Sequence, residues 1–436
     1  MQQILSFIAA KAQREKKLKF TSLVHLINVD NLTRCYAELK RHKAAGIDAM
    51  TVEAYGVDLK ERLTTLIERM KSKRYKPQPV RRVYIPKPGR ENEKRGLGIP
   101  TVEDKLVQIV LKKILESIYE ADFLECSFGF RPKRNCHGAI KALNDTIMTK
   151  PINYVVEVDI RKFFDNVSHE TMLRCLRERI ADPNILWLVE RLLKAGMIEA
   201  GQYKETEQGT PQGGNLSPLL ANIYLHYVLD LWFEKKIRPK ARGQMHLIRY
   251  CDDFVACCES EADAQEFLEQ LKTRLAAFEL SVSNEKTRVI KFGQREWYLA
   301  EKQKRKANSF NFLGFTHYAV KSRRGKWILG HKTTKENFAR KLKETKEWIK
   351  AVRNVLKLND WWPILKAKLT GHFNYFGISG NYRAIRMFRQ QVIFLALKWI
   401  NRRSQKKSMT FEKYEWYLQS HPLPEARIRF SLYQSN

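Results

Sequence analysis

Acidic residues are scarce in this sequence of 436 residues, in which 47 Asp and Glu stand against 80 Lys and Arg and leave a formal net charge of +33. An excess of this size opposes compaction through self-repulsion and is typical of a protein with an anionic partner. Nucleic acid is the first partner to consider and an anionic membrane surface the second. Hydrophobic residues still make up 44% of the chain, so it can bury a large core, and wholesale disorder is excluded.

Paired cysteines are lacking too. The chain has seven cysteines, an odd number, and no two of them have the C-x-x-C spacing. This pattern excludes a disulfide framework and a zinc ribbon. It favours a reducing, cytoplasmic location.

Long apolar runs are also missing. A membrane-spanning helix needs roughly 18 or more apolar residues in a row, and the sequence has no such stretch. The apolar run at residues 4–10 is short and precedes its positive charges, which is the reverse of the order in a signal peptide. We therefore expect no membrane segment and, from the length, two or three domains.

Basic residues are concentrated in one part of the chain. Residues 301–410 contain 27 Lys and Arg but only 5 Asp and Glu, an excess of 22. A local basic face indicates nucleic-acid binding more strongly than a high isoelectric point does, although a solvated surface is the alternative. Aromatic residues such as Trp361 and Trp399 lie among these charges, and we expect most of them to be core residues and one or two to contact nucleic acid.

The hydrophobic pattern predicts both helices and strands. Residues 1–75 should be helical, 80–100 a basic hairpin and 102–119 a long helix. Apolar strands are expected at 155–160 and, as a pair, at 247–258. Further helices are expected at 169–196, 218–235, 261–278 and from about 332 onward, and short strands at 288–292 and 310–315.

Three aspartates end or interrupt the apolar strands. Asp159 ends one strand, and Asp252 and Asp253 divide the strand pair. A carboxylate in such a place is costly to desolvate unless it is paired or ligated. Residues 250–253 have the shape of a tight hairpin with two carboxylates at its tip, and Asp159 would complete a cluster of three. Such a cluster suits two Mg²⁺ ions, because hard cations prefer oxygen ligands and two ions serve phosphoryl transfer.

Each of these acids alone has a simpler explanation. Two adjacent aspartates usually form a turn, and Asp159 by itself could cap a helix. The order of features favours the joint interpretation: a strand that ends in Asp, then the glycine loop 211–214, then Tyr-x-Asp-Asp between apolar flanks.

A series of distinctive blocks follows the same order along the chain. They are RRVYIPK at 81–87, LGIPT at 97–101, SFGFRP at 127–132, VDIRKFFD at 158–165, GTPQGG at 209–214, LSPLLAN at 216–222, YCDD at 250–253, NEKT at 284–287, FLGF at 312–315 and NYF at 374–376. Together they resemble the reverse transcriptases encoded by bacterial group II introns. The resemblance covers about residues 20–430 and is specific as a set, although Tyr-x-Asp-Asp alone would not be.

The resemblance implies an α+β right-hand polymerase, in which fingers and palm with an antiparallel sheet precede an α-helical thumb or maturase domain. Residues 1–75 would then be an N-terminal helical extension, 76–155 the fingers and 156–315 the palm with parts of the fingers. The thumb or maturase domain would cover 316–410 and a short tail 411–436. Because no Cys/His cluster follows, we expect the C-terminal endonuclease of some relatives to be absent.

The resemblance also implies the metal ligands. Asp159, Asp252 and Asp253 would hold two Mg²⁺ ions, with Mn²⁺ as a substitute, and the Ile160 carbonyl would be a further ligand. The primer 3′-hydroxyl would attack the α-phosphate of a dNTP and displace pyrophosphate. The protein would thus be an RNA-directed DNA polymerase.

The family's dNTP contacts carry over to a second set of residues. Phe164 lies at the steric-gate position, where a ring would clash with a ribose 2′-hydroxyl; the alternative is a core ring beside Phe163. Lys286 would act on pyrophosphate as a proton donor or a charge, or it is a surface lysine. The full set is Arg82, Lys87, Arg161, Lys162, Phe164, Gln212 and Lys286.

Template and primer contacts carry over to Arg131, Pro211, Gly213, Tyr250 and Cys251. Two positions depart from the family pattern. Cys251 replaces the usual Ala, which leaves a small side chain before the two aspartates. Ala49 replaces a usual second Gly, which would tighten an N-terminal turn without affecting the chemistry.

The implied partners are an RNA template, a DNA primer, the RNA–DNA duplex, dNTPs and the parent intron RNA, which the protein would help to splice as a maturase. The bacterial cytosol, close to the nucleoid, is the expected location. Two alternatives stay open. One is a relative co-opted for phage defence or a CRISPR-associated role; the other is a splicing factor with little polymerase activity, against which the three intact acids argue.

Overall fold

The computed structural model describes the chain except for residues 88–89, 200, 211–212, 323, 403–408 and 434–436, and except for the side chains of 86–87, 90–93 and 95. It divides into two compact units, of which the first contains residues 1–87, 92–139 and 156–289 and the second 88–91, 140–155 and 290–436. The five predicted domain ranges are finer than this division and stay a prediction. No helix in the described part is long and apolar enough to cross a bilayer.

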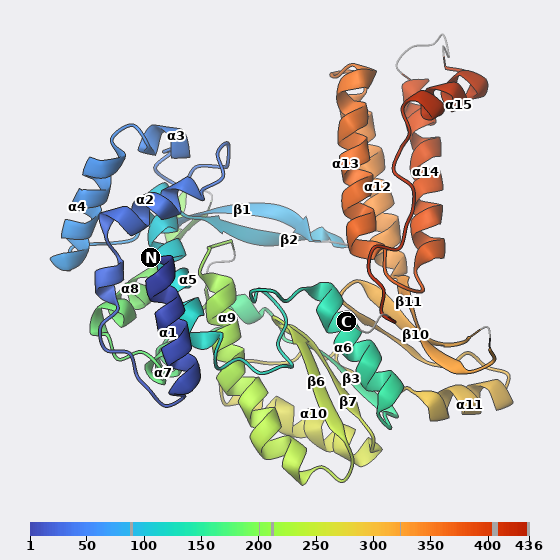
Figure 1. The fold of residues 1–436 in the computed structure, drawn as a ribbon, viewed down its shortest axis with the longest axis horizontal. Coiled ribbons are helices and arrows are strands. Elements are labelled where there is room, and N and C mark those ends of the chain that lie inside the picture. Colours follow the sequence, from blue (N-terminus) through green and yellow to red (C-terminus); the bar gives the residue numbers. More distant parts are fainter. Residues whose placement is uncertain (88–89, 200, 211–212, 323, 403–408, 434–436) are drawn as a thin grey trace. The chain divides into compact units, whose positions relative to one another are not determined.

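Helices form the start of the first unit, as the sequence predicts (Figure 1). The long helix α5 is central, because α1 and α2 both pack against it and its apolar side chains are fully buried. Thr101 starts α5 by accepting a hydrogen bond from the Asp104 N–H. The bounds are α1 (Gln2–Arg14), α2 (Val29–Ala37), α3 (Val52–Tyr55), α4 (Leu59–Lys71) and α5 (Val102–Tyr119), with a 3-10 turn at Val24–Leu26.

The turn before α3 contains the departure from the family pattern noted above. Ala49 has a φ of +55°, in the left-handed region that glycine favours. Gly46 lies so close to the start of α5 that an added Cβ would be 2.7 Å from the Thr101 Cα. The chain thus keeps this tight turn with alanine at position 49 and needs glycine at position 46.

A four-stranded sheet in the order β2-β1-β4-β5 follows. β1 (Val80–Lys87) and β2 (Arg90–Ile99) are the expected basic hairpin. Two further strands, which the sequence pattern does not predict, extend it: β4 (Met197–Glu199) pairs parallel with β1, and β5 (Gln202–Lys204) pairs antiparallel with β4.

Two helices occupy the stretch 169–196, where helical patterns are expected. They are α7 (His169–Arg177) and α8 (Pro183–Leu193). Asp182 separates them, because its carboxylate accepts hydrogen bonds from the N–H groups of Asn184 and Ile185 and so caps α8. Proline at the first position of α8 reinforces this start.

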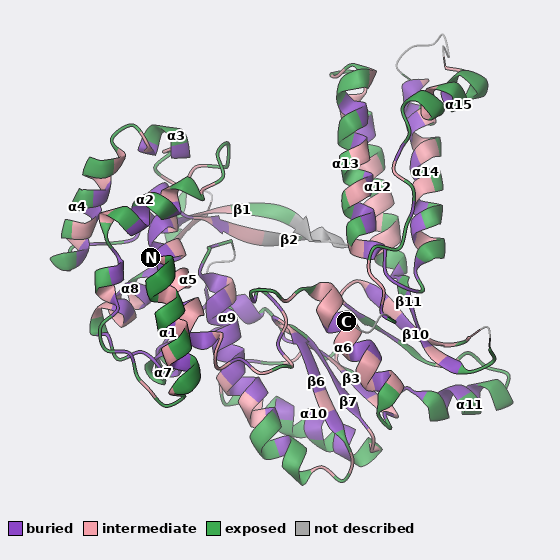
Figure 2. Cartoon of the chain, in the orientation of Figure 1, coloured by how far each residue is buried: buried purple, intermediate pink, exposed green. Residues whose placement is uncertain are grey.

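The sheet that carries the three aspartates has the order β6-β7-β3-β8. It consists of β6 (Met245–Tyr250), β7 (Asp253–Cys258), β3 (Tyr154–Asp159) and β8 (Arg288–Lys291). β6 and β7 pair antiparallel, β7 is buried from Phe254 to Cys258, and α10 (Glu261–Ala276) packs against it (Figure 2). Helix α9 (Ser217–Leu225) continues in π-helical turns at His226–Asp230 and Phe233–Ile237 and ends in a 3-10 turn at Arg238–Lys240.

The second unit combines a small sheet with long helices. Its strands β9 (Ser309–Phe312), β10 (Phe315–Lys321) and β11 (Trp327–Thr333) form an antiparallel sheet in the order β11-β10-β9. The strand expected at 310–315 is therefore two strands, and the range 316–410 is not helical throughout. The helices are α11 (Gln294–Lys302), α12 (Lys335–Val352), α13 (Leu358–Phe376), α14 (Tyr382–Ile400) and α15 (Phe411–Ser420); α6 (Cys136–Thr149) also lies mostly in this unit.

Aromatic side chains fill the core between these helices. Trp361, Trp362, Phe373, Phe376 and Trp399 are all buried in one cluster. The interpretation of most of these rings as core residues is thus confirmed. All seven cysteines are free thiols. The α+β fold class, with mixed sheets followed by C-terminal helices, is also confirmed.

Candidate active site

The turn between β6 and β7 presents the paired aspartates. Tyr250 and Asp253 are the last paired residues of the hairpin, so Cys251 and Asp252 form a two-residue loop. Cys251 has a φ of +59°, and a positive φ at the first central residue belongs to the tight turns that match strand twist. The tight hairpin predicted from the sequence is confirmed.

Cys251 is part of this turn, and its side chain is buried. Burial, and next the neighbouring Asp252 carboxylate, raises the pKa of the Cys251 thiol, which therefore stays neutral. It packs as a small apolar side chain, in agreement with the expectation that Cys can replace Ala here. The Tyr250 ring lies 6.1 Å from the Phe130 ring, between ring centroids.

Asp159 lies beside this hairpin in the sheet. It is the last residue of β3, and β3 is the hydrogen-bonded neighbour of β7, which begins at Asp253. The Asp159 carboxylate accepts a hydrogen bond from the Lys286 ammonium at 2.9 Å, and the two side chains are 44% and 48% exposed. Sequence reasoning placed Asp159 and Lys286 in one site, and the structure brings them into direct contact.

The backbone next to Asp159 is fixed by a second strand segment. The Ser283 N–H donates to the Asp159 carbonyl, and the Arg161 N–H donates to the Ser281 carbonyl. Between these two hydrogen bonds Ile160 lies opposite Val282. The two residues form a non-hydrogen-bonded pair, so their own backbone groups do not bond each other. The Ile160 carbonyl is thus left outside the ladder, at the position where the resemblance implies a metal ligand.

The residues present fit a divalent cation by their chemistry. Asp159, Asp252, Asp253 and the Ile160 carbonyl offer only hard oxygen donors, which Mg²⁺ prefers. A cation, the Lys286 ammonium, already lies against Asp159. Among the described residues no three His, Cys, Asp or Glu side chains are close enough to hold an ion, so the carboxylates are not gathered into a finished ligand set.

Beneath the turn lies a buried ion pair that sequence reasoning missed. Arg249, the residue before Tyr250, donates two hydrogen bonds to Asp230 at 2.7 and 2.5 Å, and both side chains are 0% exposed. The same guanidinium donates to the Cys251 carbonyl at 2.9 Å. Although burial opposes the charged form, the Asp230 carboxylate raises the pKa of Arg249 above its ordinary value. The Arg249 side chain therefore ties the turn to the π-helical segment that contains Asp230.

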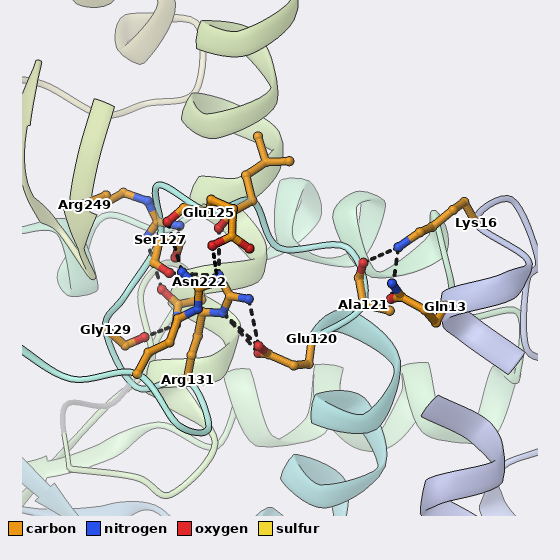
Figure 3. A network of polar contacts seen from close by, with 12 residues as sticks. Gln13, Lys16, Glu120, Ala121, Glu125, Ser127, Gly129, Arg131, Asn222 and Arg249 are labelled. Atoms are coloured by element: carbon orange, nitrogen blue, oxygen red, sulfur yellow. Dashed lines mark hydrogen bonds and ion pairs between the residues drawn. The ribbon is translucent and has the colours of Figure 1, made fainter. Parts of the chain in front are cut away.

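The network extends to the SFGFRP block and to α9 (Figure 3). Arg249 also donates to the Ser127 hydroxyl and to the side-chain oxygen of Asn222. The Asn222 amide in turn donates to the Gly129 carbonyl at 2.6 Å. A Cβ on Gly129 would lie 2.5 Å from the Cys251 nitrogen, so only glycine allows this close approach to the turn.

Arg131 belongs to the same loop. Its guanidinium, 4% exposed, pairs with Glu120 and donates to the carbonyl groups of Leu124 and Ser127 (Figure 3). Arg131 thus holds the loop that supports the turn. A template contact through this group stays a prediction, and it would require one of these bonds to be exchanged.

A cavity of about 290 Å³ brings together three of the predicted dNTP contacts, Arg82, Lys162 and Phe164. The Arg82 guanidinium lies 4.0 Å from the Asp165 carboxylate, and its Nε is buried without a hydrogen-bond partner among the described residues. Phe164 is mostly buried and lines the cavity, whereas Phe163 packs against Tyr224 in the core. The two rings thus have different surroundings, and only Phe164 lines the cavity.

The glycine loop closes one side of this cavity. The Thr210 N–H donates to the Phe164 carbonyl at 2.7 Å. Gly209 and Gly213 both have positive φ, and a Cβ on Gly213 would lie 2.8 Å from the Gly98 carbonyl oxygen. Pro211 and Gln212 lie outside the described residues, as does the side chain of Lys87, and Arg161 is exposed.

Comparison with known proteins agrees with this geometry. Residues 85–317 match the family described as reverse transcriptase (RNA-dependent DNA polymerase), a range that includes Asp159 and the turn at 250–253. The chain belongs to this family. It is similar to the group II intron-encoded protein LtrA of Lactococcus lactis subsp. cremoris, with 36% identity over 300 residues, which are 66% of this chain and 50% of LtrA.

Two further relatives support the same assignment. The protein YkfC of Escherichia coli K12 is 34% identical over 243 residues, 54% of this chain and 63% of YkfC. Nuclear intron maturase 4 of Arabidopsis thaliana, a mitochondrial protein, is 27% identical over 156 residues, 35% of this chain and 19% of the maturase. The chain spans about half the length of LtrA. The resemblance to group II intron-encoded reverse transcriptases is confirmed.

Proposed function

We propose that the protein extends a DNA primer on an RNA template. The observation that carries this proposal is the placement of Asp159 and Asp253 at the ends of neighbouring strands, with Asp252 in the adjoining turn. Members of the family use divalent metal, and we propose two Mg²⁺ ions held by these carboxylates and the Ile160 carbonyl. When bound, such ions stabilise the attacking and leaving oxygens of the transfer.

The other groups of the site would hold the dNTP. In the reaction the primer 3′-oxygen forms a bond to the α-phosphorus while the bond from that phosphorus to pyrophosphate breaks. Arg82 and Lys162 line the cavity and would attract the triphosphate by their charge. Phe164 in the same cavity would lie against the sugar, and Lys286 would offer a charge to the departing pyrophosphate.

Primer extension tests this proposal. Full-length protein with poly(rA)/oligo(dT), dTTP and Mg²⁺ should synthesise DNA, and Asp252→Ala should reduce the rate by several orders of magnitude. Asp58→Ala is the matched control, since Asp58 is an exposed aspartate at the start of α4. Undiminished synthesis by Asp252→Ala would refute the assignment of the site.

We also propose a maturase role, in which the protein binds its parent intron RNA. Two observations favour it: the excess of 22 positive charges in residues 301–410, and the similarity to an intron-encoded protein and an intron maturase. The Asp252→Ala protein should still bind the intron RNA and assist its splicing. Loss of splicing assistance together with polymerase activity would argue against a separate RNA-binding role.

A further inference from the structure

A cavity of about 610 Å³ lies within the second unit, between helices α12 and α13. Both helices pack against α14, and Phe388 of α14 contributes to the wall. Leu365, Leu369 and Phe376 of α13 supply further apolar surface. We call this space the helical cavity. Its volume falls in the range of about 300–1,000 Å³ that is usual for small-molecule sites.

His372 is the polar group inside this apolar wall. It is 9% exposed, and neither ring nitrogen has a hydrogen-bond partner among the described residues. Its ring stacks on Phe388, with 3.7 Å between the centroids. Burial, and next the Lys341 charge, lowers the pKa of His372 to about 4, so at neutral pH it offers one donor and one acceptor. Buried polar groups nearly always have partners, so His372 points to a ligand that supplies them.

Gly371, the residue before His372, keeps the cavity open. It lies inside α13, where glycine is less favourable than alanine. A Cβ at this position would meet no atom within 4 Å, so the fold does not require glycine here. Gly371 is exposed and lines the helical cavity, so a large side chain at this position would take up space at the mouth of the cavity.

The cavity also has a cationic rim. Arg340 and Lys341 lie on α12 and Lys368 on α13. Glu344, which accepts hydrogen bonds from Arg340 and Lys341, is the one acid among the lining residues. The rim therefore keeps a net charge of +2, which suits an anionic group. Together with the apolar wall, the cavity suits a ligand in which an anionic group is attached to a flat apolar one.

We propose that the helical cavity binds one unpaired nucleotide, with the base against the apolar wall, the edge of the base hydrogen-bonded to His372, and the phosphate near Lys341 and Lys368. The nucleotide belongs to an RNA strand or is free in solution, since both present the same base and phosphate. This inference uses none of the residues of the candidate active site and does not rest on the proposed polymerase function.

Fluorescence anisotropy with labelled RNA hairpins tests the proposal on the full-length protein. One hairpin carries a single bulged adenosine and the other is fully paired. The bulged hairpin should bind about tenfold more tightly, because only its unpaired base is free to leave the strand and pack against protein side chains. Gly371→Leu should abolish this difference by filling the cavity, and His372→Phe, which keeps the ring stacking, should reduce it severalfold.

The controls separate the cavity from general charge and from stability. Lys366→Gln removes a charge of the same helix outside the cavity lining, and it should leave the preference for the bulge unchanged, whereas Lys368→Gln should weaken it. Thermal denaturation should show Gly371→Leu to be at least as stable as the unaltered protein, since leucine is the better helix former. Primer extension on an unstructured template should be unaffected by both cavity variants.

Competition identifies the source of the nucleotide. Displacement of the bulged hairpin by AMP at submillimolar concentration would assign the cavity to free nucleotides, and displacement only by RNA would assign it to a strand. Displacement by inorganic phosphate as effective as that by AMP would overturn the proposal, because the base would then not be recognised. Equal binding of both hairpins, or an unchanged preference in folded Gly371→Leu, would overturn it as well.

Discussion

Arg249 and Asp230 form a bidentate ion pair with both side chains wholly buried, directly beneath the turn that carries Asp252. Arg249 precedes that turn by one residue and also bonds the Cys251 carbonyl within it. Removing one partner of such a pair leaves an uncompensated charge in the core. The stability of the sheet and the geometry of the turn therefore depend on the same side chain.

Breaking this pair should be strongly destabilising. Arg249→Met should lower the free energy of unfolding by about 3–5 kcal/mol, because Asp230 is left buried and unpaired. Arg238→Met is the matched control: it breaks an ion pair with Glu234 whose side chains are 48% and 45% exposed, and should change stability by about 0–1 kcal/mol. Urea denaturation measures both, and equal effects would contradict the role of the buried pair.

Gly129→Ala should impair catalysis through the turn. The new Cβ would lie 2.5 Å from the Cys251 backbone nitrogen, so the turn must shift. A displacement of about 1 Å near reacting groups can reduce a rate on the order of 100-fold. Gly138→Ala, nine residues along the chain, places its Cβ no closer than 3.6 Å to any neighbour and should retain full primer-extension activity. Similar rates for the two variants would contradict the argument.

Phe164→Val should admit ribonucleotides. With the ring removed from the cavity, discrimination between dUTP and UTP should fall by up to about 100-fold, the order that an apolar contact supplies against one hydroxyl. Phe163→Val should instead lower thermal stability and leave discrimination unchanged, because Phe163 packs against Tyr224. Single-nucleotide incorporation kinetics measure both variants. Unchanged discrimination in Phe164→Val would leave Phe164 as a second core ring.

Lys286→Gln should alter the dependence on metal. Because Lys286 pairs with Asp159, it competes with a divalent cation for this carboxylate. Its removal should lower the Mg²⁺ concentration for half-maximal activity about two- to fivefold, as expected for an exposed pair worth roughly 0.2–1 kcal/mol. Arg288→Gln is the control: it removes the partner of Glu157, which lies on β3 like Asp159, and it should leave the Mg²⁺ dependence unchanged. If Lys286→Gln lowers the maximal rate without changing the Mg²⁺ dependence, Lys286 acts on the phosphates. If neither the maximal rate nor the Mg²⁺ dependence changes, Lys286 is a surface lysine.

Acid should destabilise the protein at pH values where exposed carboxylates are still charged. Burial lowers the pKa of His226, His331 and His372 to about 4, and it also lowers the pKa of His317. The unfolded chain binds protons at these residues near pH 6.5, so their contribution is complete above this pH and is lost as the pH falls from about 6.5 toward 4. Burial raises the pKa of Asp104 to about 6 and also raises the pKa of Glu116 and Asp122, which opposes the trend.

The slope of stability against pH checks this expectation. His226→Phe should reduce the slope between pH 6 and 5 by the equivalent of about one proton, roughly 1.4 kcal/mol per pH unit. His42→Phe should not, since the side chain of His42 is 91% exposed. A flat stability profile between pH 7 and 5 in the unaltered protein would contradict the assignment of neutral buried histidines.

The proposed metal ligands could be singled out in the sequence because they interrupt a regular pattern. Asp159, Asp252 and Asp253 stand out against apolar strands, and the structure places Asp159 and Asp253 at the ends of adjacent strands and Asp252 in the turn. Arg249 interrupts the same kind of strand, and Asp230 lies in an equally apolar helix; these two signals were present in the sequence. Their pairing was not predictable, because 19 positions separate them and only the tertiary fold brings the two together.

Other details of the fold were not predicted, for local reasons. The boundary between α7 and α8 is signalled by the Asp-Pro pair at 182–183, but the helical periodicity on both sides obscures this signal. β10 and β11 were not predicted as strands. His317 and His331 are completely buried within them, which obscures the usual alternation of polar and apolar residues. The two rings bond each other at 3.0 Å, an arrangement that becomes visible only when the strands pair.

The partners of Arg249 also set the order in which the active turn is assembled. Ser127, Asn222 and Asp230 precede Arg249 in the chain by 122, 27 and 19 positions. Contacts of such long range form late in folding, because their loops must close first. A chain that refolds from denaturant would therefore form its basic helices, which depend on local contacts, before the turn with Asp252 is fixed.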